Sequence, residues 1–193
     1  MEKGFTITYE YGGNLYVNST NRCDFNCEFC LRHNAPGSIY TDNLWLKREP
    51  TKEEILASIE SHDLTKYAQL VFCGFGEPTE RIDILLQVAR YFKETYHKPI
   101  RINTNGLADL IWHKPTAPML KGLIDCVSVS LNAMDAEEYL KLTRSKFGIG
   151  SFDAMLKFTK ECTQYVPHVM MTVVGEPVTT PEEQEICKGI CEK

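Results

Sequence analysis

The sequence predicts an α/β fold, in which strand and helix units repeat around a mostly parallel sheet. Short apolar runs alternate with longer amphipathic segments along the chain. Capping boxes at residues 51–54 and 180–183 mark two helix starts, and the second also carries proline at the first helical position. Two consecutive predicted strands alternate apolar and polar residues, which indicates that their two faces differ in what they contact.

The expected elements fall into about five strand–helix units within one domain, residues 1–193. The last predicted helix reaches the end of the sequence, and we expect a final strand of the core to lie outside this chain. The predicted strands are 14–18, 70–74, 99–104, 127–132 and 168–174, and the predicted helices are 51–62, 82–92, 135–146, 151–165 and 180–193.

The third and fourth predicted strands each have one apolar and one polar side. In an open parallel sheet both faces are usually apolar, because helices cover both of them. A polar inner side instead favours a curved half-barrel whose interior faces a polar ligand. The apolar side carries Ile100, Ile102, Val127, Val129 and Leu131, and the polar side carries Arg101, Asn103, Asn105, Ser128, Ser130 and Asn132.

Composition narrows the functional classes. The 193 residues, 43% of them hydrophobic, suffice for one sizeable core. A net charge of -5 excludes a globally basic, nucleic-acid-binding surface. No apolar run approaches the roughly 18 residues of a membrane span, and the first residues lack the apolar segment of a signal peptide, so we predict a cytoplasmic protein. The eight cysteines then favour metal binding or buried thiols over disulfides.

Three of the cysteines, Cys23, Cys27 and Cys30, lie in one short loop directly after the first predicted strand. A structural zinc site usually takes four ligands from two separated cysteine pairs, and no second pair has that spacing. Three thiolates on an iron–sulfur cubane leave one iron open to another ligand. A zinc site, an electron-transfer cluster with a fourth ligand from elsewhere, and three unrelated buried cysteines remain as alternatives.

The spacing C-x3-C-x2-C, with the aromatic Phe29 directly before the last cysteine, resembles the radical S-adenosylmethionine (SAM) superfamily. The resemblance implies a [4Fe-4S] cluster on Cys23, Cys27 and Cys30, whose open iron is chelated by the methionine group of SAM. It also implies that one electron breaks the sulfonium bond, and that the resulting 5'-deoxyadenosyl radical abstracts hydrogen from a substrate.

Further segments are similar to the SAM-binding segments of that superfamily. Residues 74–78 resemble its G-G-E-P stretch with the second glycine shifted, and residues 103–106 resemble its T-N-G stretch. A simple β-turn and a ligand-free polar network are the alternative interpretations. By this resemblance Val173 or Val174 contacts adenine. The other residues expected to bind SAM are Phe29, Gly74, Phe75, Gly76, Glu77, Asn103, Asn105, Ser128, Ser130 and Asn132.

Taken together, the segments look like a small subfamily described as TatD-associated, which implies a TatD-type nuclease as a possible partner. The superfamily core is a partial barrel of six strand–helix units, of which we expect about five here. An enzyme of this kind also needs a one-electron donor such as flavodoxin or ferredoxin. A glycyl-radical activase, an enzyme like the carboxy-deazaguanine synthases, and a non-catalytic iron–sulfur or zinc module are the competing functions.

The remaining candidates are predicted to be structural. Cys187 and Cys191 are one helical turn apart and are expected to form an apolar helix seam, and Cys126 and Cys162 to lie in the core. Arg144 is either a ligand for a substrate carboxylate or, as more often, a helix-end or surface residue. The segment 31–49, which includes Arg32, His33 and Trp45, is expected to cover the site.

Overall fold

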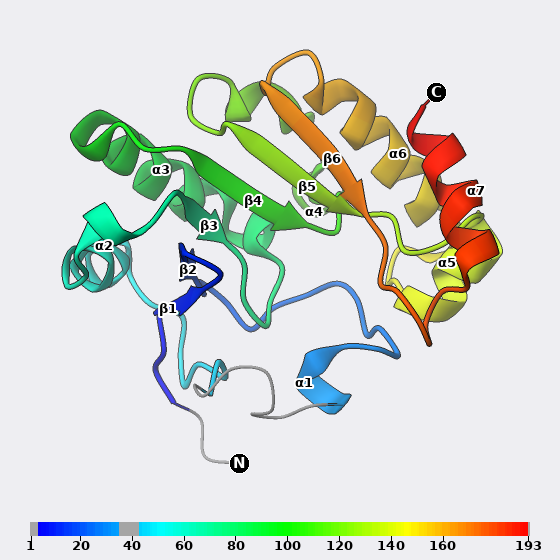
Figure 1. The fold of residues 1–193 in the computed structure, drawn as a ribbon, viewed down its shortest axis with the longest axis horizontal. Helices are drawn as coiled ribbons and strands as arrows, with labels where there is room; N and C mark the ends of the chain where they lie inside the picture. Colours follow the sequence, from blue (N-terminus) through cyan, green and yellow to red (C-terminus); the bar gives the residue numbers. More distant parts are fainter. Residues whose placement is uncertain (1–3, 35–42, 193) are drawn as a thin grey trace.

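A computed structural model describes residues 4–34 and 43–192, which form a six-stranded sheet in the order β1-β2-β3-β4-β5-β6 (Figure 1). The five predicted strands are confirmed and run parallel. They are β2 (Asn14–Val17), β3 (Leu70–Phe72), β4 (Ile100–Thr104), β5 (Cys126–Ser130) and β6 (His168–Thr172).

The sixth strand, β1 (Thr8–Tyr11), was not predicted and pairs antiparallel with β2. Gly12 and Gly13 make the tight turn between them with φ of 54° and 75°, a conformation that favours glycine. Residues 5–11 alternate apolar and polar side chains, so the sequence does carry a strand pattern here that our prediction missed.

Seven helices are present in the described part of the chain, and both capping boxes are confirmed at Thr51 and Thr180. The helix predicted over 135–146 ends at Thr143, because Arg144 takes a left-handed φ of 49°. The helices are α1 (Leu31–Asn34), α2 (Lys52–Glu60), α3 (Ile82–Tyr96), α4 (Ala108–Trp112), α5 (Ala136–Thr143), α6 (Ser151–Cys162) and α7 (Pro181–Cys191). None of them is both long and apolar enough to cross a bilayer.

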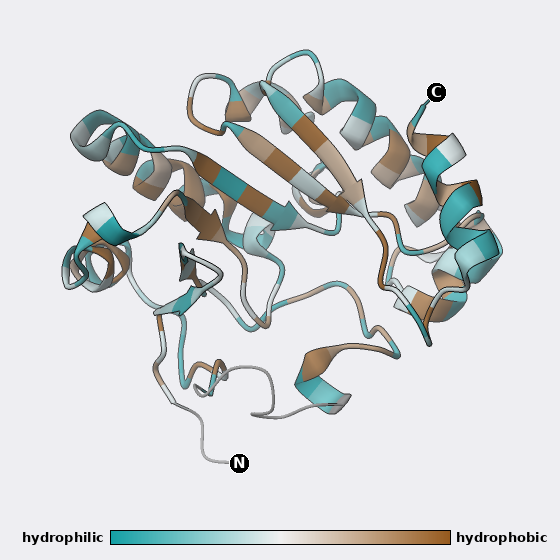
Figure 2. Cartoon of the chain, in the orientation of Figure 1, coloured by the Kyte–Doolittle hydropathy of each residue, from teal (hydrophilic) through white to brown (hydrophobic). Residues whose placement is uncertain are grey.

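The main core lies between the sheet and the helices, and it contains the predicted apolar side of β4 and β5. Ile102 and Val127 have at most 1% of their surface exposed, and Leu85 and Phe92 of α3 pack in the same cluster. Figure 2 shows the alternation of polar and apolar residues along β4. The sheet therefore has an outer face, buried under helices, and an inner face formed by the alternate side chains.

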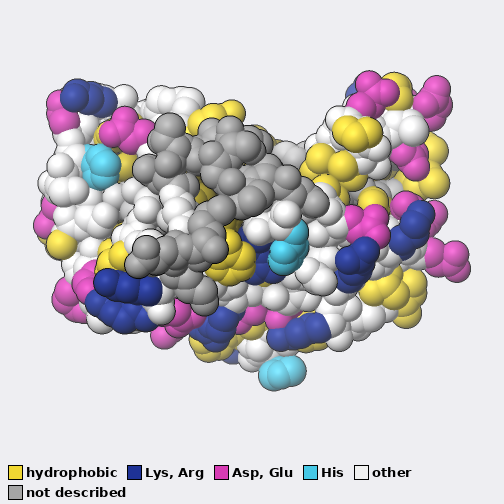
Figure 3. Space-filling model, turned by 90° about the horizontal axis from the view of Figure 1, so that it is seen from below, with side chains coloured by type: hydrophobic (Ala, Val, Ile, Leu, Met, Phe, Trp, Pro, Cys, Tyr) yellow, Lys and Arg dark blue, Asp and Glu magenta, His cyan; other side chains and the backbone are white. Residues whose placement is uncertain are grey.

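The inner face carries only a small apolar cluster, made of Tyr9, Tyr16, Leu44 and Val71. Beyond this cluster, towards β6, the side chains of the inner face are mostly polar. Seen from below, the outline of the molecule is hollowed beside a raised flank (Figure 3). The predicted half-barrel with a polar interior is thus what the fold provides.

Candidate active site

A cleft of about 550 Å³ lies where the parallel strands end, and the cysteine loop forms one of its walls. Apart from the Val173 or Val174 contact, thirteen residues were expected to hold the cluster or SAM, and all of them line this cleft although they come from separate segments of the chain. They are Cys23, Cys27, Phe29, Cys30, Gly74, Phe75, Gly76, Glu77, Asn103, Asn105, Ser128, Ser130 and Asn132.

The three loop cysteines are free thiols and half-buried. Burial raises the pKa of the Cys23 and Cys27 thiols to about 12, and the charge of Arg32 opposes that rise. Within the described residues, no three His, Cys, Asp or Glu side chains gather closely enough to hold a single metal ion. Thiols spread around one cleft are soft donors suited to an iron–sulfur cluster, in which each sulfur ligand binds a different iron. The residues therefore fit such a cluster.

The cysteine loop is held in place by residues at the C-terminal end of α5 and just after it. Two amides of the loop donate to α5 carbonyls, Asn26 N to Thr143 O at 2.9 Å and Glu28 N to Leu142 O at 3.0 Å. Lys146 pairs with the buried carboxylate of Asp24. The half-barrel is thus closed by contacts between residues more than a hundred positions apart.

Arg144 belongs to this support, and its guanidinium contacts the cysteine loop. Its guanidinium donates to Glu28 Oε1 at 2.6 Å. The prediction that it serves as a surface or helix-end residue is therefore confirmed, and its partner in the cysteine loop could not be read from the sequence.

Arg32, in the segment expected to cover the site, holds the loop from its other side. It donates to the carbonyls of Asn21 at 3.1 Å and Phe25 at 3.3 Å, which flank Cys23. Its guanidinium lies 5.6 Å from the centre of the Trp45 ring and lines the cleft. A permanent positive charge is thereby fixed beside thiols that must become anionic to bind metal.

The glycines after β3 are required by protein contacts. A Cβ on Gly74 would lie 2.1 Å from Asn18 Oδ1, and one on Gly76 would lie 2.3 Å from Thr20 O. These glycines are among the residues expected to bind SAM. The structure shows that they first permit close approach of the chain segment leaving β2, which brings Glu77 N within 2.7 Å of Arg22 O.

The Glu77 carboxylate is buried and accepts four hydrogen bonds. Oε1 accepts from Thr79 N at 3.0 Å and from the hydroxyls of Thr79 and Thr104 at 2.7 Å, and Oε2 accepts from Asn105 N at 2.8 Å. Burial raises the pKa of Glu77, and these donors oppose the rise. Glu77 therefore joins the ends of β3 and β4, in addition to lining the cleft in which SAM was predicted to bind.

Two asparagine side chains of the cleft have unsatisfied polar atoms. Asn103 Oδ1 and Asn105 Nδ2 are buried without a hydrogen-bond partner. Such atoms are costly unless a ligand or water satisfies them, so they mark the place where a polar ligand would bind. Asn132, at φ of 57°, accepts from Val174 N at 3.2 Å, and Val174 lines the cleft while Val173 lines a cavity beside α7.

Comparison with known protein families identifies the family to which this chain belongs. The family model described as the radical SAM superfamily matches residues 17–189. The chain belongs to the radical SAM superfamily. Members of this superfamily are enzymes that use a [4Fe-4S] cluster and SAM, and the predicted fold and cofactors are thereby confirmed.

Among the relatives of this radical SAM protein is a probable GTP 3',8-cyclase from Thermococcus kodakarensis. It is 29% identical over 162 residues, which are 83% of this chain and 47% of that protein. The chain thus spans about half the length of the curated relatives it matches. A radical SAM methyltransferase from Sphaerobacter thermophilus has a TM-score of 0.64 at 19% identity, covering 95% of this chain and 54% of that one. The structure of anSMEcpe with bound AdoMet has a TM-score of 0.55 at 19% identity, and the match covers 82% of this chain and 42% of that chain.

Of the four other cysteines predicted to be structural, Cys162 and Cys187 are buried as predicted, and Cys126 and Cys191 are not. Cys162 and Cys187 lie in the main core, and Cys191 is exposed, with its thiol donating to Cys187 O. The prediction for Cys126 is wrong, because it is half-buried on the inner face and not in the core. Cys73 also lies on the inner face and lines the cleft.

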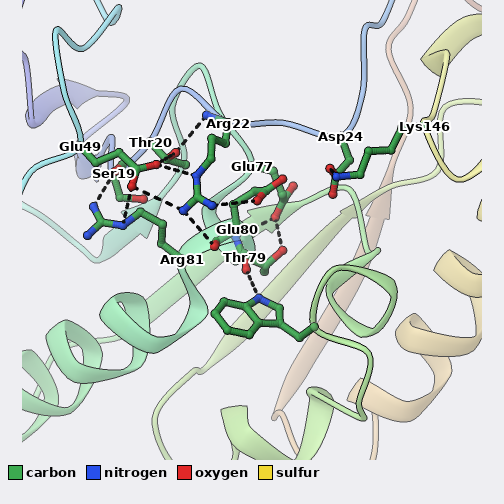
Figure 4. Close-up of polar contacts among 11 residues, drawn as sticks. Ser19, Thr20, Arg22, Asp24, Glu49, Glu77, Thr79, Glu80, Arg81 and Lys146 are labelled. Carbon is green, nitrogen blue, oxygen red and sulfur yellow. Dashed lines mark hydrogen bonds and ion pairs between the residues drawn. The ribbon is translucent and has the colours of Figure 1, made fainter.

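A second set of ion pairs behind the cysteine loop was not predicted (Figure 4). Glu49 accepts from Thr20 Oγ1 at 2.6 Å and from Arg22 Nε at 2.7 Å, while Arg81 donates to two backbone carbonyls. Burial and the neighbouring Asp24 carboxylate raise the pKa of Glu80 to about 7. These residues are far apart in sequence and carry no motif, so no sequence signal could have found them.

Proposed function

We propose that Cys23, Cys27 and Cys30 hold the [4Fe-4S] cluster, and that the enzyme cleaves SAM reductively and abstracts hydrogen from a second substrate. When bound, the cluster supplies the electron that splits SAM into methionine and a 5'-deoxyadenosyl radical. The observation that carries the proposal is that all thirteen predicted ligand residues border one cleft.

The chain's own residues would bind and orient the ligands. Arg32 and the end of α5 hold the loop that places the three thiols in the wall of the cleft. Asn103 Oδ1 offers an acceptor and Asn105 Nδ2 a donor to SAM. Phe29 and Phe75 supply apolar surface in the same cleft, and exclusion of water there would protect a radical from side reactions.

The substrate is a further part of the proposal. Curated relatives are named as probable GTP 3',8-cyclases, which supports a purine nucleotide as the first substrate to test. A TatD-type nuclease partner, a flavodoxin or ferredoxin as electron donor, and a cytoplasmic location remain proposals from the sequence. Membership in an enzyme superfamily disfavours the non-catalytic zinc or electron-transfer module.

The test is anaerobic reconstitution with iron and sulfide, reduction with dithionite, and measurement of 5'-deoxyadenosine and methionine formed from SAM. We expect both products in equal amounts from the wild-type protein and from Cys191→Ala, whose thiol is exposed and outside the cleft. Fully reconstituted protein that forms neither product would contradict the proposal. Deuterated GTP then tests the substrate, since transfer of deuterium into 5'-deoxyadenosine requires abstraction from the nucleotide.

A further inference from the structure

Arg101 lies at the centre of a row of side chains that crosses the inner face. The register of the parallel strands aligns Tyr16 of β2, Val71 of β3, Arg101 of β4, Cys126 of β5 and His168 of β6. Because residues in register on neighbouring strands point to the same side of a sheet, this row faces the interior of the half-barrel.

The guanidinium of Arg101 has a buried donor that no protein group satisfies. Nη2 donates to the Tyr16 hydroxyl at 3.1 Å, while Nε is buried and has no hydrogen-bond partner. In the described ranges no carboxylate pairs with Arg101. Asp125, next to Cys126 in the chain, pairs with Lys93 at 2.5 Å and accepts from Ile100 N at 2.8 Å.

An arginine has five donors and keeps its charge at all physiological pH values. Holding such a charge in a partly buried position is unfavourable unless an anion compensates it. The field of this charge extends towards the cleft. Burial raises the pKa of the Cys73 thiol, and Arg101 is among the groups that oppose the rise.

Arg101 also lines a cavity of about 500 Å³, together with Gln69, Cys126 and His168. The next residue on the same face of β4 is Asn103, which borders the SAM cleft. Two residues along a strand span roughly 7 Å. A ligand group bound at Arg101 would therefore lie next to the cleft, within the reach of a small molecule that extends from one cavity to the other.

We propose that Arg101 binds an anionic group of the substrate, a carboxylate or a phosphate, and so orients the rest of the substrate towards the SAM cleft. The inference deepens and rests on the proposed function, because it names the substrate class of the same site. Both anions offer the pair of oxygens that a guanidinium fork binds, so the chemistry on the protein side is the same for either.

The experiment titrates the reconstituted, SAM-loaded protein with inorganic pyrophosphate and with glutarate by calorimetry. We expect at least one probe to bind, and its affinity to fall roughly tenfold or more in Arg101→Met. Arg101→Lys should lose less, because it keeps the charge but not the fork. Arg90→Met removes an exposed arginine from α3 and is the matched control, with affinity unchanged.

A second measurement on wild-type protein does not depend on how a variant folds. Phenylglyoxal should modify Arg101, and the bound probe should protect it, as read by peptide mass spectrometry. Tighter pyrophosphate binding would support a phosphate on the substrate, and tighter glutarate binding a carboxylate. Equal affinity of wild type and Arg101→Met, or absence of protection by both probes, would overturn the inference.

Assay of 5'-deoxyadenosine on the same preparations separates this inference from the proposed function. If the protein cleaves SAM but binds no anion through Arg101, the inferred anion site is wrong and the proposed SAM cleavage stands. Anion binding that depends on Arg101, in a fully reconstituted protein that never cleaves SAM, would support the anion site and remove the proposed chemistry.

Discussion

The two faces of strands β4 and β5 differ in what they provide, although they are built from alternate residues of the same segments. On the outer face, Ile102 and Val127 are fully packed against helices. On the inner face, Arg101 Nε and Asn103 Oδ1 are buried and lack partners. The outer face therefore supplies stability, and the inner face leaves polar groups unsatisfied at a cost in stability that a bound ligand would recover.

The largest effect, on iron content, should come from substitutions in the cysteine loop, whose thiols lie beside the inner face and are the predicted metal ligands. Replacing Cys23, Cys27 or Cys30 with alanine should remove nearly all reconstituted iron, because two thiolates hold a cubane poorly. Iron and sulfide per chain are the measurement, with Cys191→Ala as the control that keeps full content. Wild-type iron content in any of the three variants would show that the cleft does not hold the cluster through that thiol.

A paired substitution on neighbouring residues of β4 tests the comparison directly. Ile102→Ala should lower the free energy of unfolding by about 3 kcal/mol, through lost burial and a cavity in the core. Asn103→Ala should lower it by less than about 1 kcal/mol, since its Oδ1 has no partner. Urea unfolding of the metal-free protein measures both. A larger loss for Asn103→Ala would reverse the roles of the two faces.

Glu77 combines the two roles, because it borders the ligand cleft and also stabilises the fold by joining β3 to β4. Glu77→Gln places an amide where the carboxylate now accepts four hydrogen bonds, so the free energy of unfolding should fall by about 2 kcal/mol. Glu94→Gln, at an exposed position of α3, is the control. Unchanged stability together with weaker SAM binding would assign Glu77 to the ligand alone.

The smallest effect concerns Glu80, a half-buried acid behind the cysteine loop. The pKa of Glu80 is raised to about 7, above its unfolded value of about 4.3. The native state therefore keeps a proton that the unfolded state has lost, and stability falls as pH rises from about 4.3 to 7. Glu80→Gln should remove this decline and gain about 1 kcal/mol relative to wild type at alkaline pH. Parallel stability–pH curves for the two proteins would contradict the assignment.

Local patterns predicted the five parallel strands, both capped helices and the polar interior, because alternation and capping act over a few residues. Strand β1 was missed although residues 5–11 alternate apolar and polar side chains. The contact of Arg144 with Glu28 was missed because 116 positions separate the two residues. The site residues were found through motif resemblance, and what the sequence could not show is that Gly74 and Glu77 also serve the fold.

The most direct test of the account is electron paramagnetic resonance of the reduced cluster with and without SAM. If the inner face binds SAM at an open iron, adding SAM should change the spectrum of the wild-type protein. The same change should be weaker at equal SAM concentration in Asn103→Ala, which removes an unsatisfied cleft atom. A spectrum that is identical with and without SAM in fully reconstituted wild-type protein would contradict the central claim.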